Sequence, residues 1–246
     1  MKMFFFYQII FSILIVLSPL IIIYRILKKK EDPKRILEKF GTPGKQKKGK
    51  NLIWFHGASI GEILSIIPII KFYEKKRFID QILVTSSTLS SSKVLKKYNF
   101  KKTIHQFYPI DHILITNKFL KYWKPKVAIF IESEIWPSMF NNLNQKKIPI
   151  ILLNARLTKK TFNKWIQIKY FAKSIFEKIS IAYPQNNETF TYLKNLKLKK
   201  LKMIGNLKFV ENKEENLNKI NKNLKLFLKR RKIWIASSTH KNEEII

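Results

Sequence analysis

The longest apolar stretch of the chain lies at its N-terminus, where no charged residue occurs between Met3 and Tyr24. As a helix this stretch would be about 33 Å long, which is enough to cross the hydrocarbon core of a bilayer. Arg25 and three lysines follow it, so the positive-inside rule places the rest of the chain on the cytoplasmic side. A cleaved signal peptide would have a shorter apolar core and a small-residue cleavage site. The pattern predicts an uncleaved anchor over residues 1–30, which either spans the membrane or lies in its interface.

A polar, basic linker is predicted over residues 31–50, and beyond it apolar runs of strand length alternate with segments of helical length. The predicted strands are Leu52–His56, Gln81–Ser86, Val127–Glu132, Ile148–Asn154 and Ile179–Tyr183, and the helices between them include Glu62–Lys76 and Thr158–Lys173. Short, continuous apolar strands are typical of a parallel sheet that is covered on both faces. The fold class is therefore α/β, with one domain over residues 51–210. A very polar helix is predicted after it, over Glu211–Arg231.

The charge of the chain is strongly positive and is carried almost entirely by lysine. Lys and Arg exceed Asp and Glu by 33, yet only six of the 49 basic residues are arginine. Such a charge favours an acidic partner, such as nucleic acid, an anionic membrane surface or a phosphorylated substrate, or it reflects compositional drift on solvated faces. Scarce arginine argues against nucleic-acid reading, because arginine makes the bidentate contacts to bases and phosphates. The absence of cysteine excludes disulfides and thiolate metal sites.

The turns that follow the strands are the places to look for chemistry, because ligands of parallel α/β sheets bind at the carboxyl ends of the strands. The first turn runs from His56 to Glu62, and a helix is expected to begin near Ser59. Its free N–H groups and Gly61 suit an anionic ligand. Glu62 has two interpretations: a base that removes a proton from a sugar hydroxyl, or the partner of Ser59 in a capping box. By itself, His56 is expected to be a packed or hydrogen-bonded histidine.

Two other turns are rich in hydrogen-bonding groups. A run of hydroxyls begins with Thr85, Ser86, Ser87 and Thr88, and it either binds a sugar or phosphate or caps a helix. Further along, Gly205 and Asn206 suit a tight turn that would aim Lys208 into the cleft.

Acidic residues leave the strand that ends near Ile131. Glu132 and Glu134 precede Trp136, and they either serve the site or place negative charge at a helix N-terminus. The next strand ends at Asn154 and Arg156. Arg156 either pairs with one of the glutamates or binds a phosphate.

These motifs, in this order, resemble the Kdo transferase family, whose members transfer 3-deoxy-D-manno-octulosonic acid. The similar segments are HGASIGE at 56–62, TSSTLSS at 85–91, KPKVAIFIESEIWP at 124–137, IPIILLNARLT at 148–158, GNLKF at 205–209 and ASSTHKNEE at 236–244. The N-terminal anchor and the segment EDPKRILEKFG at 31–41 are similar as well. The resemblance extends over nearly the whole chain.

The resemblance implies a Rossmann-like N-terminal half of a GT-B glycosyltransferase in the cell inner membrane. It implies Glu62 as the base of an inverting transfer from CMP-Kdo to a lipid A precursor, without a metal or other cofactor. Glu132, Glu134 and Lys208 are implied to stabilise charge. The remaining predicted contacts to substrate are those of Ser59, Gly61, Ser86, Ser87, Thr88, Trp136, Asn154, Arg156 and Asn206.

The resemblance also implies that residues 211–246 hold a linker helix and only the start of a donor-binding domain. A chain truncated in this way is expected to bind lipid acceptor but not CMP-Kdo, unless a second chain supplies the missing C-terminal half. Two other functions stay open at this point: a membrane-tethered basic nucleic-acid-binding protein, and a glycosyltransferase of the same fold with another lipid acceptor. No nucleic-acid partner is expected, because acidic residues gather at the presumed cleft.

Overall fold

The computed structural model describes residues 2–207, 226 and 229. The chain divides after Val210 into two units, and the first contains all but two of the described residues. Lys208 and, except for two isolated positions, the predicted helix Glu211–Arg231 lie outside the described residues.

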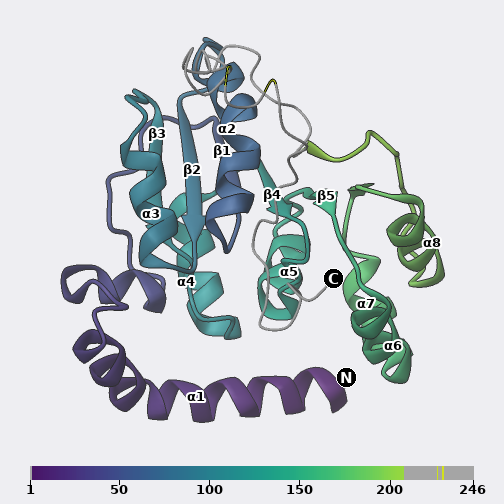
Figure 1. Ribbon diagram of the computed structural model, residues 1–246. Helices are drawn as coiled ribbons and strands as arrows, with labels where there is room; N and C mark the ends of the chain where they lie inside the picture. Colours follow the sequence, from purple (N-terminus) through teal and green to yellow (C-terminus); the bar gives the residue numbers. More distant parts are fainter. Residues whose placement is uncertain (1, 208–225, 227–228, 230–246) are drawn as a thin grey trace. The chain divides into compact units, whose positions relative to one another are not determined.

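Within residues 2–207, six parallel strands form one sheet (Figure 1). The strands are β1 (Leu52–His56), β2 (Gln81–Ser86), β3 (Thr103–Phe107), β4 (Val127–Ile131), β5 (Ile150–Ala155) and β6 (Ile181–Pro184). Their order, β3-β2-β1-β4-β5-β6, reverses direction between β1 and β4, where Phe55 lies opposite Ile129. This is the order of doubly wound Rossmann-like sheets, whose ligands bind at the reversal. The predicted α/β class and Rossmann-like architecture are confirmed.

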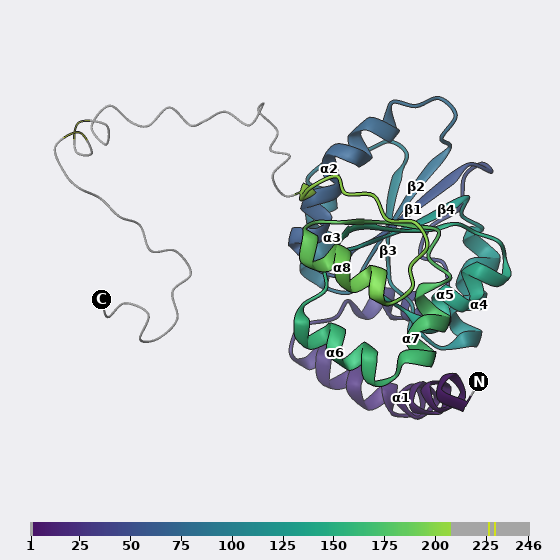
Figure 2. The ribbon, with the colours of Figure 1, turned by 90° about the vertical axis from the view of Figure 1, so that its right-hand side faces the viewer.

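Helices cover both faces of the sheet because successive strand residues point to opposite sides (Figure 2). Trp54 packs with Phe119 and Phe130 in one apolar cluster, whereas its neighbour Phe55 packs with Ile63 in the other. The helices are α2 (Ile60–Glu74), α3 (Leu89–Lys96), α4 (Ile113–Trp123), α5 (Pro137–Gln145), α6 (Lys159–Gln167), α7 (Lys169–Phe176) and α8 (Asn187–Asn195). The first cluster lies under α4, α5 and α7, and the second under α2 and α3.

The predicted single helix Thr158–Lys173 is instead two helices, α6 and α7, which meet at Ile168. Ile168 leaves helical geometry at φ −116° and ψ 43°. The break lets the Trp165 ring of α6 pack edge-on against Phe176 of α7, with 5.2 Å between ring centroids. Tertiary packing of the aromatic rings therefore overrides a helical pattern that is continuous in the sequence.

The segment predicted as a basic linker contains a short 3-10 helix, η1 (Pro33–Phe40). Asp32 caps its start by accepting the Lys34 N–H at 3.0 Å. Gly41 ends it at φ 75°, and a Cβ there would lie 2.6 Å from the Ile115 carbonyl oxygen. Only glycine fits that position, so the segment is a packed part of the domain.

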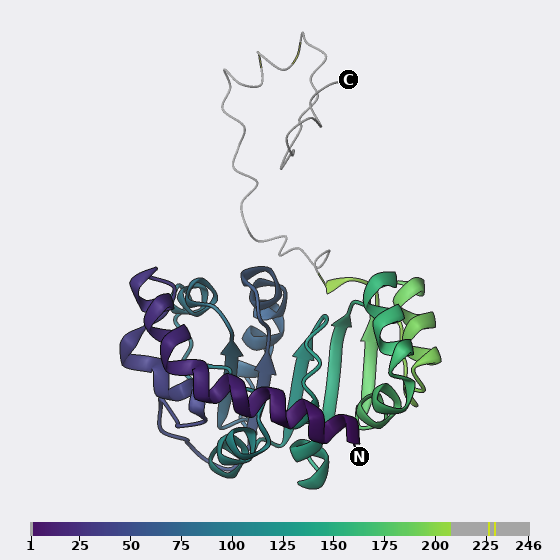
Figure 3. The same ribbon diagram turned by 90° about the horizontal axis from the view of Figure 1, so that it is seen from below.

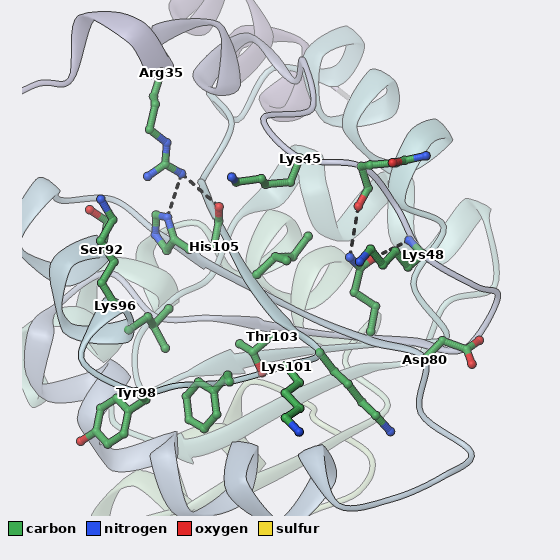
Figure 4. A pocket seen from close by; sticks show the side chains of 16 residues that line it. Arg35, Lys45, Lys48, Asp80, Ser92, Lys96, Tyr98, Lys101, Thr103 and His105 are labelled. Carbon is green, nitrogen blue, oxygen red and sulfur yellow. Dashed lines mark hydrogen bonds between the residues drawn. The ribbon is translucent and has the colours of Figure 1, made fainter.

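Side chains of η1 seal the open edge of β3, beside a basic hollow of about 610 Å³ (Figure 4). Arg35 binds both carboxylate oxygens of Glu38, at 2.7 and 2.8 Å, and donates to the His105 carbonyl at 3.0 Å. Glu38 in turn accepts the Phe107 N–H at 2.7 Å. Backbone groups that would otherwise face another strand are thus satisfied within the domain.

The apolar N-terminal helix α1 (Lys2–Leu27) runs along the domain (Figures 1 and 3). By length and composition it could cross a membrane, and only 6% of its apolar window is buried. Near its start, the Tyr7 hydroxyl donates to Asp111 at 2.7 Å and the Gln8 amide donates to Ser138 at 2.7 Å. Asp111 follows β3 and Ser138 follows β4, so α1 contacts the domain at the carboxyl edge of the sheet.

Candidate active site

The predicted turn from His56 to Glu62 and the one that carries Glu132 and Glu134 meet where the sheet order reverses. β1 and β4 are neighbours, and the chain that leaves β4 folds back over the end of β1. As a result, the His56 Nε2 lies 3.0 Å from the Glu134 Oε2. The site is therefore built from segments more than seventy residues apart.

Glu62 takes part in a capping box at the start of α2, as the sequence interpretation allows. The Glu62 N–H donates to the Ser59 Oγ at 3.2 Å, and the Ser59 hydroxyl donates back to the Glu62 Oε1 at 2.8 Å. The other carboxylate oxygen accepts the Ala58 N–H at 2.8 Å. This geometry confirms the capping role and holds the carboxylate in one orientation at the mouth of the site.

The environment of Glu62 also suits a base. Burial raises the pKa of its carboxyl group, the hydrogen bonds from Ser59 and Ala58 lower it, and the charges of Glu134 and Glu132 raise it further. The net shift is upward. A helix N-terminus would by itself reduce the basicity of a carboxylate. Here desolvation outweighs the hydrogen bonds from Ser59 and Ala58, which act in the same direction as a helix N-terminus.

The glycines of this turn serve different purposes. A Cβ on Gly57 would lie 3.1 Å from the Glu62 Cβ, so a larger residue would push against the carboxylate's own side chain. A Cβ on Gly61 would meet nothing closer than the Ser59 Oγ at 4.0 Å. Gly61 is exposed, and it leaves the first turn of α2 open to a ligand.

The pKa of the Glu134 carboxyl group is shifted in the opposite direction from that of Glu62. Burial would raise its pKa, but the hydrogen bond and electrostatic attraction of His56, with the hydrogen bond from the Trp136 indole, outweigh burial and lower it. The Trp136 Nε1–H donates to the Glu134 Oε2 at 2.9 Å. Paired carboxylates with pKa values shifted apart are typical of a site in which one accepts a proton while the other stays ionised.

A buried chain of hydrogen bonds holds His56 against Glu134. The Trp54 Nε1–H donates to the Thr85 Oγ1 at 2.9 Å, and that oxygen lies 3.0 Å from the His56 Nδ1. An ionised carboxylate only accepts, so the His56 Nε2 carries a proton toward Glu134. The Tyr108 ring stacks on the imidazole with 3.8 Å between centroids. The expectation of a hydrogen-bonded histidine is confirmed, and its partner is a site residue.

The strand ends beside this cluster have unusual backbone geometry. Glu132, which is buried, has φ 56°, and Asn154 at the end of β5 has φ 52°. Residues other than glycine rarely occupy this left-handed region, which costs of order 1 kcal/mol or more. The Glu132 N–H donates to the Leu153 carbonyl at 3.0 Å, so the two turns are tied together.

In the hydroxyl run after β2, one residue caps a helix and another is hydrogen-bonded within the domain. Thr88 caps α3 by accepting the Ser91 N–H at 3.2 Å. The Ser86 Oγ lies 2.8 Å from the His105 Nε2 and is buried. Ser87 is half-buried between them. The Ser91 hydroxyl donates to the Ala58 carbonyl at 3.3 Å, so this turn lies next to the one that carries Glu62.

Asn154 and Arg156 take separate positions. The Asn154 Oδ1 accepts the Leu207 N–H at 3.0 Å, which fixes the segment that carries Asn206. Arg156 is exposed and lines a hollow of about 490 Å³ with Thr158, Glu188 and Asn206, among other residues. The polar lining of this hollow suits a phosphate or sugar better than an apolar ligand.

Sequence reasoning missed Tyr108, the strand that precedes it, and the contact of Thr85 with His56. The β3 segment carries His105 and Gln106 among its apolar residues, so it lacks the continuous apolar pattern of the other strands. Thr85 lies within the quoted hydroxyl motif, yet its role depends on a partner from β1. Only the pairing of strands reveals either residue.

Comparison with known proteins decides the family. Residues 34–211 match the family described as 3-deoxy-D-manno-octulosonic-acid transferase, or Kdo transferase. The chain belongs to this family. The resemblance drawn from the motifs is thereby confirmed, and the matched residues include every described candidate of the site.

Several Kdo transferases are similar over most of the chain. A relative from Rickettsia bellii is 35% identical over 92% of this chain and 54% of its own length. A probable mitochondrial Kdo transferase of Arabidopsis thaliana is 33% identical over 92% and 53%, and one from Haemophilus influenzae is 29% identical over 96% and 57%. The chain thus spans about half the length of these relatives. Among solved structures, a UDP-N-acetylglucosamine 2-epimerase has a TM-score of 0.48 at 12% identity, covering 64% of this chain and 49% of its own.

Proposed function

We propose that this chain provides the acceptor-binding domain and the general base of a glycosyltransferase that moves Kdo from CMP-Kdo to a lipid A precursor. The observation that carries the proposal is the pair Glu62 and Glu134, whose pKa values are shifted up and down at the carboxyl edge of a Rossmann-like sheet. Membership of the Kdo transferase family favours glycosyl transfer over nucleic-acid binding.

In the proposed reaction, Glu62 accepts the proton of the acceptor hydroxyl while that oxygen attacks the anomeric carbon of Kdo. The bond from this carbon to the phosphate oxygen of CMP breaks, and CMP leaves with the electron pair. Attack opposite the leaving group inverts the configuration. Glu134 remains ionised, held by His56 and Trp136, and stabilises positive charge that develops on the sugar.

The remaining candidate residues have proposed roles in binding. Gly61 and Ser87 leave the mouth of the site open to the acceptor sugar, and Arg156 is placed to contact a phosphate group. Glu132 and Lys208 are proposed to stabilise charge. The reaction is proposed to need no metal or other cofactor, so transfer should be unchanged by a chelator such as EDTA.

The helix α1 suggests how the lipid acceptor reaches the site. Its contacts to Asp111 and Ser138 lie at the same edge of the sheet as Glu62. We propose that α1 anchors this edge to the cytoplasmic face of the inner membrane, with the helix lying in the interface along the domain. An anchor of this kind confines the enzyme to the surface that carries its acceptor, which raises the effective concentration of the acceptor.

Transfer of labelled Kdo to a lipid A precursor tests the proposal. Membranes containing this chain joined to the C-terminal half of the Rickettsia bellii relative supply both halves, and membranes with either half alone are the controls. We expect label in the lipid with the joined protein only. Nanodiscs carrying the present chain should bind the lipid acceptor without donor. Failure of both transfer by the joined protein and acceptor binding by the chain would refute the proposal.

A further inference from the structure

A hollow lined by lysines lies at the amino ends of the strands, away from the candidate site. Its volume is about 560 Å³. The other lining residues are Leu120, Pro125 and Ile148, so no acidic side chain of the described residues contributes to its wall. The lysines, called the lysine hollow below, are Lys47, Lys50, Lys121, Lys124, Lys126, Lys146 and Lys147.

Backbone contacts fix the segments that carry these charges. The Lys126 N–H donates to the Leu52 carbonyl at 2.8 Å, which joins the entrances of β4 and β1. The Lys47 N–H donates to the Tyr122 hydroxyl at 3.1 Å, which joins the η1–β1 segment to α4. The lysines are therefore held around one hollow by the topology of the sheet and are not spread along a flexible tail.

Helix ends explain only part of the cluster. α4 ends at Trp123 and α5 at Gln145, and their partial negative charge stabilises nearby lysines such as Lys121 and Lys146. Lys47 and Lys126 belong to neither helix and lie in segments that enter strands. Among the ion pairs of the described residues, none includes a lysine of the hollow.

Repulsion among these lysines is already visible at Lys47. Burial lowers the pKa of its ammonium group, and the charges of Lys124 and Lys126 lower it further. A bound anion stabilises like charges that are held together in this way, because its attraction to each ammonium group offsets their mutual repulsion.

The chemistry of the lining indicates which anion fits. Lysine binds phosphate as a mobile point charge, and several lysines around one hollow suit several linked phosphates. None of the lining residues is aromatic. A nucleic-acid groove usually offers rings on which bases stack. We propose that the lysine hollow is a binding site for a linear polyphosphate group.

This site is distinct from the proposed contact with the membrane. The strand arrows in Figure 1 point toward the side where α1 lies, whereas the hollow is lined by residues that precede β1, β4 and β5. A bilayer that holds α1 would therefore leave the lysine hollow open to the cytoplasm. Its ligand is then a soluble polyphosphate and not a lipid headgroup.

Calorimetry of the full chain in non-ionic detergent tests the site, with inorganic tripolyphosphate as the probe at about 0.15 M salt. The test variant is Lys47→Gln/Lys124→Gln/Lys126→Gln. Its control, Lys160→Gln/Lys164→Gln/Lys169→Gln, removes the same charge from exposed positions of α6 and α7. We expect the test variant to lose at least about tenfold in affinity and the control to lose less than about twofold.

Several results would overturn the proposal: no binding by the wild-type chain, equal losses in the two variants, or tighter binding of single-stranded DNA that competes with tripolyphosphate. Vesicles of phosphatidylglycerol serve as a further arm, and their displacement of tripolyphosphate would assign the hollow to lipid instead. Should the triple variant fail to fold, Lys47→Gln alone removes the most crowded charge while its backbone contact to Tyr122 stays.

Discussion

At the scale of single residues, Glu62 and Glu134 acquire opposite properties from nearby features. Glu62 is bonded by neutral hydroxyl and amide donors and is raised in pKa mainly by burial. Glu134 is half-buried, and the His56 ring and the Trp136 indole both donate to it. Each carboxylate has two donors, so the kind of donor, together with burial, decides in which direction each carboxyl pKa moves.

Replacement of Glu62 by glutamine should separate the two roles of this residue. Gln keeps the length of the side chain and can still cap α2, but it cannot accept the acceptor's proton. We expect Kdo transfer by the joined protein to fall by about 10²–10⁴-fold. The melting temperature should not fall, because the variant removes a carboxylate that is disfavoured by burial. Near-normal turnover would show that Glu62 is only a cap.

The pH dependence of transfer follows from the same shift. The base must be ionised, and its pKa lies above the ordinary value for glutamate. Transfer should therefore rise with pH through this raised pKa and level off above it, as measured by initial rates with the joined protein. Folding responds in the opposite sense: the contribution of Glu62 to stability is complete below its unfolded pKa and is lost as pH rises through its folded pKa. A rate that falls over this range would contradict the assignment.

Replacement of His56 by phenylalanine should remove one of the two hydrogen bonds to the Glu134 carboxylate. Phe keeps an aromatic ring against Tyr108 but donates no proton, so the pKa of Glu134 should rise. Loss of the hydrogen bond should lower the free energy of unfolding by about 1–3 kcal/mol at neutral pH. A lowered pKa stabilises the fold above the unfolded pKa, and that stability is lost as pH falls through the folded pKa. The difference between variant and wild type should therefore shrink in acid.

The measurement is NMR titration of ¹³C-labelled glutamate together with urea unfolding at several pH values. Thr85→Val is the control, because it breaks the contact on the Nδ1 side of His56 and leaves the Nε2 contact in place. An unchanged Glu134 pKa in the His56 variant would show that the histidine only packs.

At the scale of elements, the edge of the sheet depends on a helix from outside it. η1 supplies Arg35 and Glu38, whose side chains satisfy the backbone of β3 at His105 and Phe107. In the sequence, residues 31–50 have the pattern of a polar linker, because the contacts that hold η1 in place are made with a strand some seventy residues later. A pattern of polar residues does not distinguish a loop from a helix that packs through polar side chains.

Replacement of Arg35 by methionine tests this seal. It leaves the buried Glu38 carboxylate without its cation, and we expect a loss of about 3 kcal/mol, near the lower bound for a buried pair because Arg35 is partly exposed. Amide exchange at Phe107 should accelerate. Lys173→Met is the matched control, since it breaks the exposed Lys173–Glu177 pair and should cost less than about 1 kcal/mol. Equal losses in the two variants would contradict a sealing role.

At the scale of the whole described domain, charge and anchor lie at different ends of the sheet. α1 contacts the carboxyl edge, whereas the lysine hollow lies at the amino ends of the strands. Basic residues near the anchor include Arg25, Lys29 and Lys30, which line a small hollow with Ser90 and Lys93 of α3. Of these two groups, the second lies beside α1, so it is the one that the proposed anchoring would bring to an anionic bilayer.

Deletion of residues 1–30 should therefore release the protein from membranes only in part. The expected residual binding to anionic vesicles depends on charges of the remaining domain, such as Lys93, and is screened by salt. Sedimentation with anionic and neutral vesicles, at low and high salt, measures it. Membrane retention of the shortened protein that does not change with salt would contradict the electrostatic explanation, and so would equal binding to neutral vesicles.

Some features of this protein follow from the sequence alone. The apolar stretch before Arg25, the continuous apolar strands and the Ser59–Glu62 capping box depend on residues close together in the chain. Local periodicity and local hydrogen bonding are sufficient to predict them. The turns at the carboxyl ends also follow, because a parallel sheet brings the ends of its strands to one edge.

Tertiary structure decided the rest. The edge strand β3, the break at Ile168 and the contact of His56 with Glu134 all require partners that are distant in the chain. The pKa of Glu62 is likewise set by how much water the folded site excludes, and its sign could not be derived from the competing effects of helix and cleft. Strand order and burial exist only in three dimensions, so a linear pattern can place a carboxylate in a turn but cannot fix its proton affinity.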